Sequence, residues 1–139
     1  MRYAKRLLTV AVALIGMVAV MDLSLHAQTS ALKVSIPFAF QAGQKTLPAG
    51  TYLVLKQGEA IWFSDGKGNA AAVLANAIPN KAVGLDNVVV FHRYGDQHFL
   101  SEVRWSESST ARGVAETKAE HRLANATSSE SVKLAANPR

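Results

Sequence analysis

Apolar and polar residues alternate with a period of two along much of this chain, a pattern typical of β-strands that bury one face. The alternation is clearest in residues 31–40, where every second side chain from Leu32 to Phe40 is apolar. Pro37 lies within this run and cannot donate a backbone hydrogen bond, so we expect the strand to lie at a sheet edge or to be interrupted there. Shorter runs of similar character follow at residues 51–56, 60–64, 70–75, 88–94 and 97–105.

The strongest local signal is a hairpin within residues 88–105. Gly95-Asp96 separates two runs rich in β-branched and aromatic residues, and glycine in the first position suits a type II′ turn. A two-residue loop pairs Tyr94 with Gln97, and the register that follows pairs Phe91 with Leu100 and Val90 with Ser101. This register places His92 and Ser101 on one face of the hairpin and His98 on the other.

Turn signals divide the rest of the β region into short segments. Residues 65–69, Asp-Gly-Lys-Gly-Asn, join residues 60–64 to residues 70–75 as a second hairpin, although a short helix is the alternative for the alanine-rich second arm. Residues 76–87 are the longest break in the β pattern and are predicted to be a loop of the kind that carries binding residues. The predicted fold is a small antiparallel sandwich or open barrel of six to seven short strands, followed by one peripheral C-terminal helix.

The chain changes character after residue 105. Residues 106–110 are polar, and the spacing in residues 114–126 predicts a helix that Gly113 caps. Its charged side chains, Glu120 among them, are expected to face solvent. The opposite face carries a shallow apolar stripe, which consists of Ala115, Ala119, Leu123 and Ala126.

The first 27 residues have the features of a secretory signal peptide. Arg2, Lys5 and Arg6 precede an apolar run at residues 7–21, and the small Ala27 marks a cleavage site before Gln28. The alternative is an uncleaved membrane anchor, since the run is about five residues short of a comfortable span. We expect export to the periplasm or the medium. The predicted organisation is a signal peptide at residues 1–27, a β domain at 28–110, a helix at 111–127 and a flexible tail at 128–139.

Composition excludes several classes of function. Removal of the signal peptide takes away three basic residues and Asp22, so the formal charge falls from +5 to +3. That charge is too small to indicate nucleic-acid binding. The chain has no cysteine, which excludes disulfides, thiol catalysis and thiolate metal sites, so the hydrophobic core must stabilise the exported domain.

Three segments resemble small exported β-rich proteins of unknown function from acidobacterial-type soil bacteria. They are Val-Ser-Ile-Pro-Phe-Ala-Phe at residues 34–40, Thr-Leu-Pro-Ala-Gly-Thr-Tyr at 46–52, and Val-Phe-His-Arg-Tyr-Gly-Asp-Gln-His-Phe-Leu-Ser-Glu-Val at 90–103. The likeness extends to about Trp105, and its last segment is the most specific. It implies an exported location and carries no activity, cofactor or catalytic residue with it.

The residues offer three kinds of candidate chemistry. A metal site at His92 and His98 is not expected, because the two side chains lie on opposite faces of the hairpin. Ser101 and His92 share a face and could act as nucleophile and base, but no orienting group and no Gly-x-Ser-x-Gly elbow accompanies them. The polar tip of the hairpin is the candidate ligand-binding site, formed by His92, Arg93, Tyr94 and His98.

The sequence therefore predicts a non-catalytic exported module that binds an envelope partner or ligand or has a structural role, without cofactor or metal. The alternative is an exported hydrolase that uses His92. We expect no contact with nucleic acid, and none with a membrane after signal removal. An edge strand that begins near Ala31 could pair with a second copy and form a homodimer by sheet extension.

Overall fold

The computed structural model describes residues 31–81, 84 and 86–139; the predicted signal peptide lies outside these residues. The mainly β prediction is confirmed, but the sheet has 11 strands rather than six or seven. The strands are β1 (Ala31–Ile36), β2 (Phe40–Ala42), β3 (Lys45–Leu47), β4 (Gly50–Gln57), β5 (Ala60–Ser64), β6 (Ala70–Leu74), β7 (Asn76–Pro79), β8 (Asn87–Tyr94), β9 (Gln97–Arg104), β10 (Thr110–Gly113) and β11 (Glu130–Pro138). The helix is α2 (Lys118–Ala126). The count was too low because three-residue and four-residue strands such as β2, β3 and β7 are too short to show an alternation.

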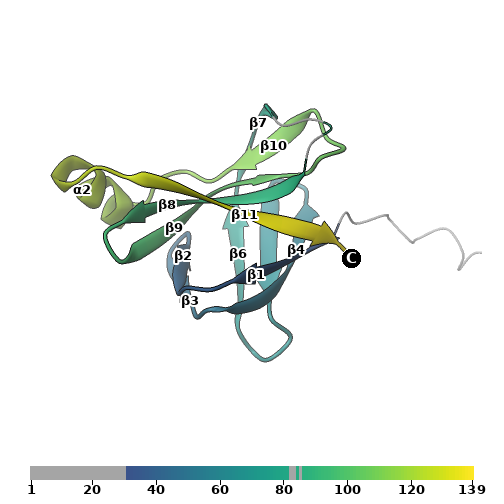
Figure 1. Cartoon of the computed structure of the whole chain (residues 1–139), viewed down its shortest axis with the longest axis horizontal. Coiled ribbons are helices and arrows are strands. Elements are labelled where there is room, and N and C mark those ends of the chain that lie inside the picture. Colours follow the sequence, from purple (N-terminus) through teal and green to yellow (C-terminus); the bar gives the residue numbers. More distant parts are fainter. Residues whose placement is uncertain (1–30, 82–83, 85) are drawn as a thin grey trace, which may run out of the picture.

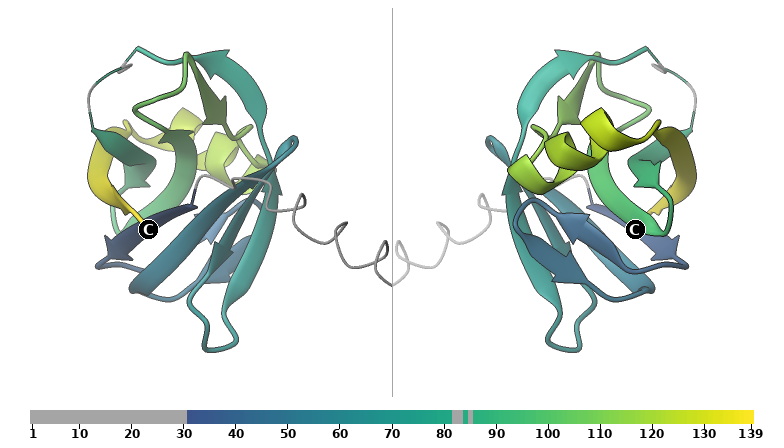
Figure 2. Two further views of the ribbon diagram at one scale, coloured as in Figure 1. Left: turned by 90° about the vertical axis from the view of Figure 1, so that its right-hand side faces the viewer. Right: turned by 90° about the vertical axis from the view of Figure 1, so that its left-hand side faces the viewer.

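The strands form one sheet that curls into a nearly closed barrel (Figures 1 and 2). Its main path runs β3-β2-β9-β8-β11-β1-β4-β5-β6, and the pair β7 and β10 extends from β9. Neighbours on this path are antiparallel except β2 and β9, which run parallel. The two ends of the path meet where the Nζ atom of Lys45 in β3 donates a hydrogen bond to the carbonyl oxygen of Ala70 in β6, at 2.5 Å.

Side chains fill the interior of the barrel. The alternation of β1 sends Leu32, Val34 and Ile36 inward, as predicted, and the strand ends before Pro37. Aromatic rings from four different strands meet at the centre, each no more than 1% exposed: Phe40, Tyr52, Phe63 and Phe91. The Phe40 ring contacts the Phe91 and Tyr52 rings edge-on, at centroid distances of 5.3 and 5.4 Å. These rings occupy the space that a larger barrel would leave for a ligand.

The hairpin of β8 and β9 is confirmed. Gly95 has a φ of +61° and Asp96 does not have a positive φ, as a type II′ turn requires. The predicted register holds from the turn as far as the pair of Phe91 and Leu100. Beyond it a β-bulge intervenes, so Val90 pairs with Glu102 rather than Ser101. The extra residue reverses which side chains of β9 point inward beyond the bulge. Val103 therefore lies in the core instead of on the His92 face.

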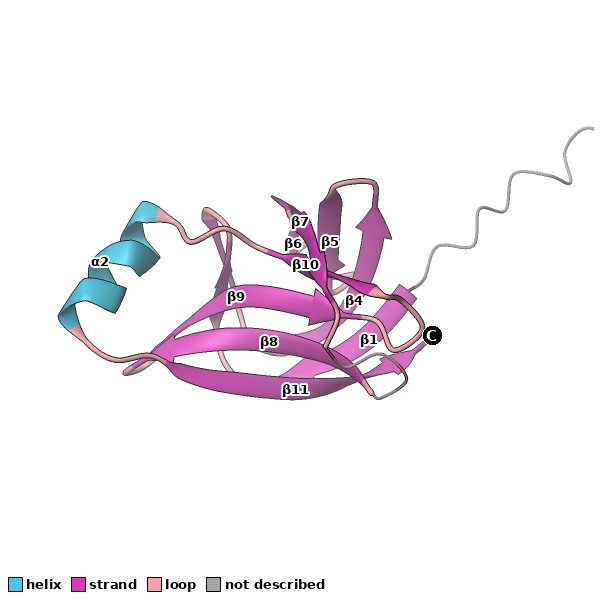
Figure 3. Ribbon diagram, turned by 90° about the horizontal axis from the view of Figure 1, so that it is seen from above, coloured by secondary structure: helices cyan, strands magenta, loops and turns pink. Residues whose placement is uncertain are grey.

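The predicted flexible tail is instead a strand. Strand β11 lies between β8 and β1 and pairs antiparallel with both (Figure 3). Its Val132 and Leu134 pack against the core and Ala136 is buried, so a weak alternation was present in a segment that otherwise looks polar. With β11 on one side and β4 on the other, β1 is not an edge strand. Strand β1 therefore has no free edge near Ala31 through which the predicted homodimer could form by sheet extension.

Two other predictions about connections are wrong. Residues 76–79 of the predicted long loop form β7, which pairs with β10 from the supposed polar connector region. Asn80 follows β7, and its side-chain amide donates hydrogen bonds to the carbonyl oxygens of Trp105 at 2.9 Å and Ser108 at 2.7 Å. These bonds replace water at buried backbone groups, so two segments that look like loops in sequence are held together.

Candidate functional sites

Helix α2 lies at one end of the barrel (Figures 1 and 3). It docks through a charged residue, Glu120. It begins at Lys118 rather than near Gly113, because the Thr117 side chain caps it and accepts a hydrogen bond from the Glu120 backbone N–H at 3.2 Å. Glu120 is 3% exposed, whereas Ala115 and Ala119 of the predicted stripe are exposed. The expectation that Glu120 faces solvent is therefore wrong. No helix among the described residues is long and apolar enough to cross a membrane.

Glu120 completes a chain of hydrogen bonds with Ser101 and His92 on the outer face of β8 and β9. Its Oε1 atom lies 2.9 Å from Nδ1 of His92, and the Nε2 atom of His92 lies 3.1 Å from Oγ of Ser101. The Tyr94 hydroxyl donates to the same carboxylate oxygen at 3.2 Å. We call this arrangement the Ser101–His92–Glu120 chain. The hairpin register brought Ser101 and His92 together, as predicted, and the structure adds the orienting carboxylate.

The hydrogen bonds of the chain fit one polarity. With Glu120 ionised, its carboxylate only accepts, so Nδ1 of His92 would donate to it and Nε2 of the neutral ring would accept from the Ser101 hydroxyl. Burial raises the pKa of Tyr94, and the negative charge of Glu120 raises it further. This polarity, from hydroxyl to imidazole to carboxylate, is the order that a serine nucleophile and its base require.

Glu120 could have been found from the sequence. The pattern Thr-Lys-Ala-Glu at residues 117–120 matches a capping box, in which a threonine N-cap is followed three residues later by a glutamate. It marks a helix start four residues after Gly113 and places Glu120 in the first turn, beside the sheet end. The pattern does not show which side chains of the sheet the carboxylate meets.

A metal ion could also be held at this place. A ring nitrogen of His92 and one carboxylate oxygen each of Glu116 and Glu120 all lie within 4.8 Å of one another, a set of nitrogen and oxygen donors that suits a divalent cation. The hairpin register separates His92 from His98, as predicted. The two glutamates were not predicted as ligands, because Glu116 and Glu120 return to the hairpin only in the tertiary structure.

The four residues predicted to form one ligand site are divided by the sheet. His92 and Tyr94 contact Glu120, whereas His98 stacks on Phe38 with a centroid distance of 3.7 Å and an interplanar angle of 11°. Burial, and then the positive charge of Arg93, lower the pKa of His98. The Arg93 side chain, about half exposed, lies 3.7 Å from the carboxylate of Glu130 in β11. The tip of the hairpin does not gather the four into one site.

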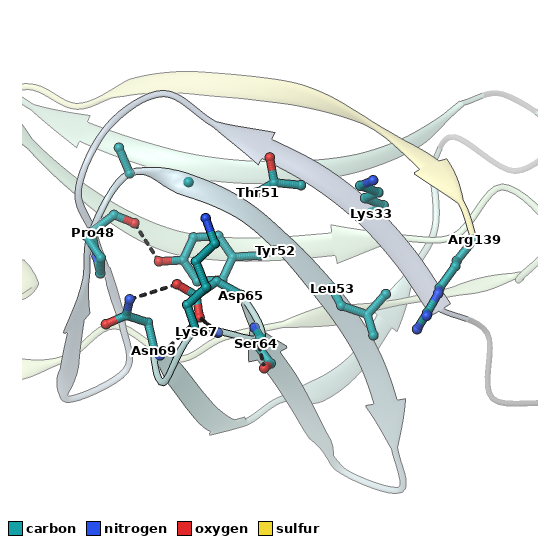
Figure 4. Close-up of a pocket in the computed structure, with 13 residues that line it drawn as sticks. Lys33, Pro48, Thr51, Tyr52, Leu53, Ser64, Asp65, Lys67, Asn69 and Arg139 are labelled. Atoms are coloured by element: carbon teal, nitrogen blue, oxygen red, sulfur yellow. Dashed lines mark hydrogen bonds between the residues drawn. The ribbon is translucent and has the colours of Figure 1, made fainter.

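A second candidate site is a hollow of about 690 Å³ on the outer face of the sheet (Figure 4). Strands β1, β4 and β5 form its floor, where Lys33 pairs with Leu53 and Leu53 with Ser64. Lys67 comes from the turn between β5 and β6, and Arg139 follows β11. We call this site the cationic hollow, after Lys33, Lys67 and Arg139.

The acidic side chain of the cationic hollow, Asp65, is already engaged by its own turn. Its carboxylate accepts hydrogen bonds from the side-chain amide of Asn69 and the backbone N–H of Lys67, both at 2.7 Å. The Asn69 bond, followed by the Lys67 bond, lowers the pKa of Asp65, so it stays ionised. Among the described residues, the ion pairs within 4.0 Å involve none of the three cations that define the hollow.

Comparisons with known proteins add no family to this geometry. No protein-family profile matches the chain, and neither a curated protein nor a solved structure was found to be similar to it. The resemblance to acidobacterial exported proteins stays a prediction, and so does export itself.

Proposed function

We propose that this chain is an exported, non-catalytic β module that binds an anionic ligand in the cationic hollow. The observation that carries the proposal is the gathering of Lys33, Lys67 and Arg139 around one hollow while the neighbouring Asp65 is held by hydrogen bonds of its own turn. Lysine and arginine side chains bind phosphate and carboxylate groups through charge-assisted hydrogen bonds. The ligand is therefore expected to carry groups of that chemistry.

The shape of the molecule supports a site on the outside. The interior of the barrel is filled by aromatic rings, so a ligand has no room there. The hollow, at about 690 Å³, lies within the ~300–1,000 Å³ range of small-molecule sites. Its floor is a paired sheet, which holds Lys33 and Leu53 in fixed positions.

The proposal is tested by titration with two soluble anions, pyrophosphate and citrate, followed by amide NMR. We expect shifts confined to residues near Lys33 and to the turn at residues 65–69. Replacing both Lys33 and Lys67 with glutamine should weaken binding by about tenfold, from about 0.7 kcal/mol for each exposed charge. Arg122→Gln, which removes one exposed cation on α2 that does not line the hollow, is the control for a change of charge elsewhere and should bind as the parent does. Shifts scattered over the surface, or equal weakening by the control, would contradict the proposal.

The Ser101–His92–Glu120 chain favours a second candidate function, hydrolysis of an ester or similar acyl compound. In that reaction the Ser101 Oγ attacks the carbonyl carbon while its proton passes to Nε2 of His92, and the leaving alcohol then takes that proton. Water afterwards releases the acyl group by the same route. The distances of 3.1 and 2.9 Å support the roles of nucleophile, base and orienting carboxylate.

Hydrolysis is tested by labelling the protein with a fluorophosphonate and by assaying p-nitrophenyl acetate. An enzyme should lose both signals on Ser101→Ala and the ester activity on His92→Gln, whereas Ser35→Ala on an exposed position should retain them. If the parent protein shows no labelling, or if Ser101→Ala labels equally, the chain of hydrogen bonds serves only to hold α2.

A further inference from the structure

The outer face of strands β4, β5 and β6 is apolar although it is open to solvent. Side chains on this face pair across the strands, Leu55 with Trp62 and Trp62 with Ala72. Trp62 is 44% exposed and Leu74 is 79% exposed, the two large hydrophobic side chains in the described chain that are exposed. We call Leu53, Leu55, Trp62, Ala72 and Leu74 the apolar face. A soluble domain does not need this arrangement, because the alternation could have placed polar residues here.

The apolar face is continuous with the cationic hollow. Leu53 belongs to both, since it lines the hollow and lies on the same outer side of β4 as Leu55. In Figure 4 it lies between Lys67 and Arg139. One surface therefore presents aliphatic and aromatic side chains next to three cations.

We infer that this surface docks on an anionic lipid membrane, with the apolar face in contact with the acyl boundary and the cationic hollow over the headgroup phosphates. The inference rests on the proposed function, of which it names the ligand. Tryptophan is enriched at membrane interfaces, and basic side chains beside it are attracted to anionic lipid. Surface contact of this kind differs from a membrane span, and it departs from the expectation that the exported chain contacts no membrane.

The charges argue against a second copy of the chain as the occupant. Two copies joined through the apolar face by a two-fold axis would place Lys33, Lys67 and Arg139 of both copies around one interface. The three cations of each copy outnumber its one carboxylate side chain in the hollow, Asp65, so the two hollows would repel one another. An anionic surface complements the same cations.

The test uses the chain from residue 28 onward, the predicted mature form; the buried core of the described residues extends from Leu32 to Ala136. Vesicles of equal parts phosphatidylglycerol and phosphatidylcholine are compared with pure phosphatidylcholine, by co-sedimentation and by tryptophan emission. Trp62 is exposed and Trp105 is 4% exposed, so a blue shift on binding reports on Trp62. We expect binding and a blue shift with the anionic vesicles alone.

Variants separate this inference from the proposed function. Trp62→Ser together with Leu74→Ser should lower vesicle binding at least tenfold and abolish the shift, while pyrophosphate binding is retained. Lys33→Gln with Lys67→Gln should lower both, and Arg122→Gln neither. Pyrophosphate binding without vesicle binding would overturn the membrane inference and leave the proposed function standing. Concentration-dependent dimerisation that buries Trp62 and shifts its emission without lipid would also overturn the membrane inference. It would indicate that a second copy of the chain covers the apolar face.

Discussion

Burying a carboxylate costs free energy unless hydrogen-bond donors replace the water that it loses. For Glu120 the donors are the ring of His92 and the hydroxyl of Tyr94, both from β8. The same contacts that would orient His92 as a base therefore also hold α2 against the barrel. A stability measurement reports on this structural role whether or not Ser101 reacts.

Replacing Glu120 with alanine should lower the free energy of unfolding by about 1.5–3 kcal/mol, because Nδ1 of His92 and the Tyr94 hydroxyl would lose a shared charged acceptor. Urea unfolding followed by circular dichroism measures the loss. Glu130→Ala removes a carboxylate whose pair with Arg93 is exposed, and it should cost no more than about 0.5 kcal/mol. Equal losses in the two variants would show that Glu120 is no more than a surface charge.

The lowered pKa of His98 makes stability depend on pH. Above its ordinary value near 6.5 the ring is neutral in both folded and unfolded chains, so its contribution to stability is fully present. As the pH falls below that value the unfolded chain takes up the proton first, and stability is lost down to the lowered folded pKa. His98→Phe keeps a ring against Phe38 and should flatten the decline of the urea midpoint between pH 7.5 and 5.5. An unchanged slope would contradict the assignment to His98.

At the scale of elements, β11 has the largest effect on the fold. It joins β8 to β1, so strands β1, β4, β5 and β6 share one sheet with the hairpin through β11, whereas β2 and β3 reach the hairpin directly through β9. Its adjacent residues Ala135 and Ala136 are the same amino acid but differ in burial: Ala135 is exposed, whereas Ala136 is 5% exposed. They make a matched pair for testing whether the strand exists in solution.

Ala136→Asp should destabilise the protein by about 3 kcal/mol or more, since it places an unpaired charge in the core. Ala135→Asp should change the stability by less than about 0.5 kcal/mol, because that side chain faces solvent. Thermal unfolding of both variants separates the two sites. If residues 128–139 formed a flexible tail, both substitutions would be silent.

At the scale of the whole molecule, the near closure of the barrel makes one core from most of its strands. Side chains of β1, β2, β4, β5, β8 and β9 meet there, whereas β7 and β10 contribute none to it. Such a core should unfold in one step. Far-ultraviolet circular dichroism and the emission of the buried Trp105 should therefore give coincident urea transitions. Two separate midpoints would show that β7 and β10, beside Trp105, open independently.

Patterns within single strands were enough to predict much of this fold. The alternation of β1, the turn at Gly95-Asp96 and the hairpin of β5 and β6 are decided by neighbours a few residues apart. Burial was predicted for β1, and register for the β8–β9 hairpin as far as Phe91 and Leu100, whereas the β5–β6 hairpin was predicted without a register. The pairing of Ser101 with His92 follows from the same local geometry, since a turn of fixed length sets which residues face each other.

Only the tertiary structure decided the rest. The central position of β11 and the burial of Glu120 depend on partners that lie 26 or more residues away in sequence. The bulge at Val90 is within the hairpin, but no turn or alternation signal in the sequence marks it. A polar segment such as residues 128–139 becomes a strand because β1 and β8 each leave a row of backbone groups to be paired. A glutamate on a helix becomes buried because a histidine and a tyrosine offer it hydrogen bonds. The sequence by itself determined the strands and turns, whereas long-range pairing determined the sites, because backbone and carboxylate groups take whichever partners the closed barrel brings to them.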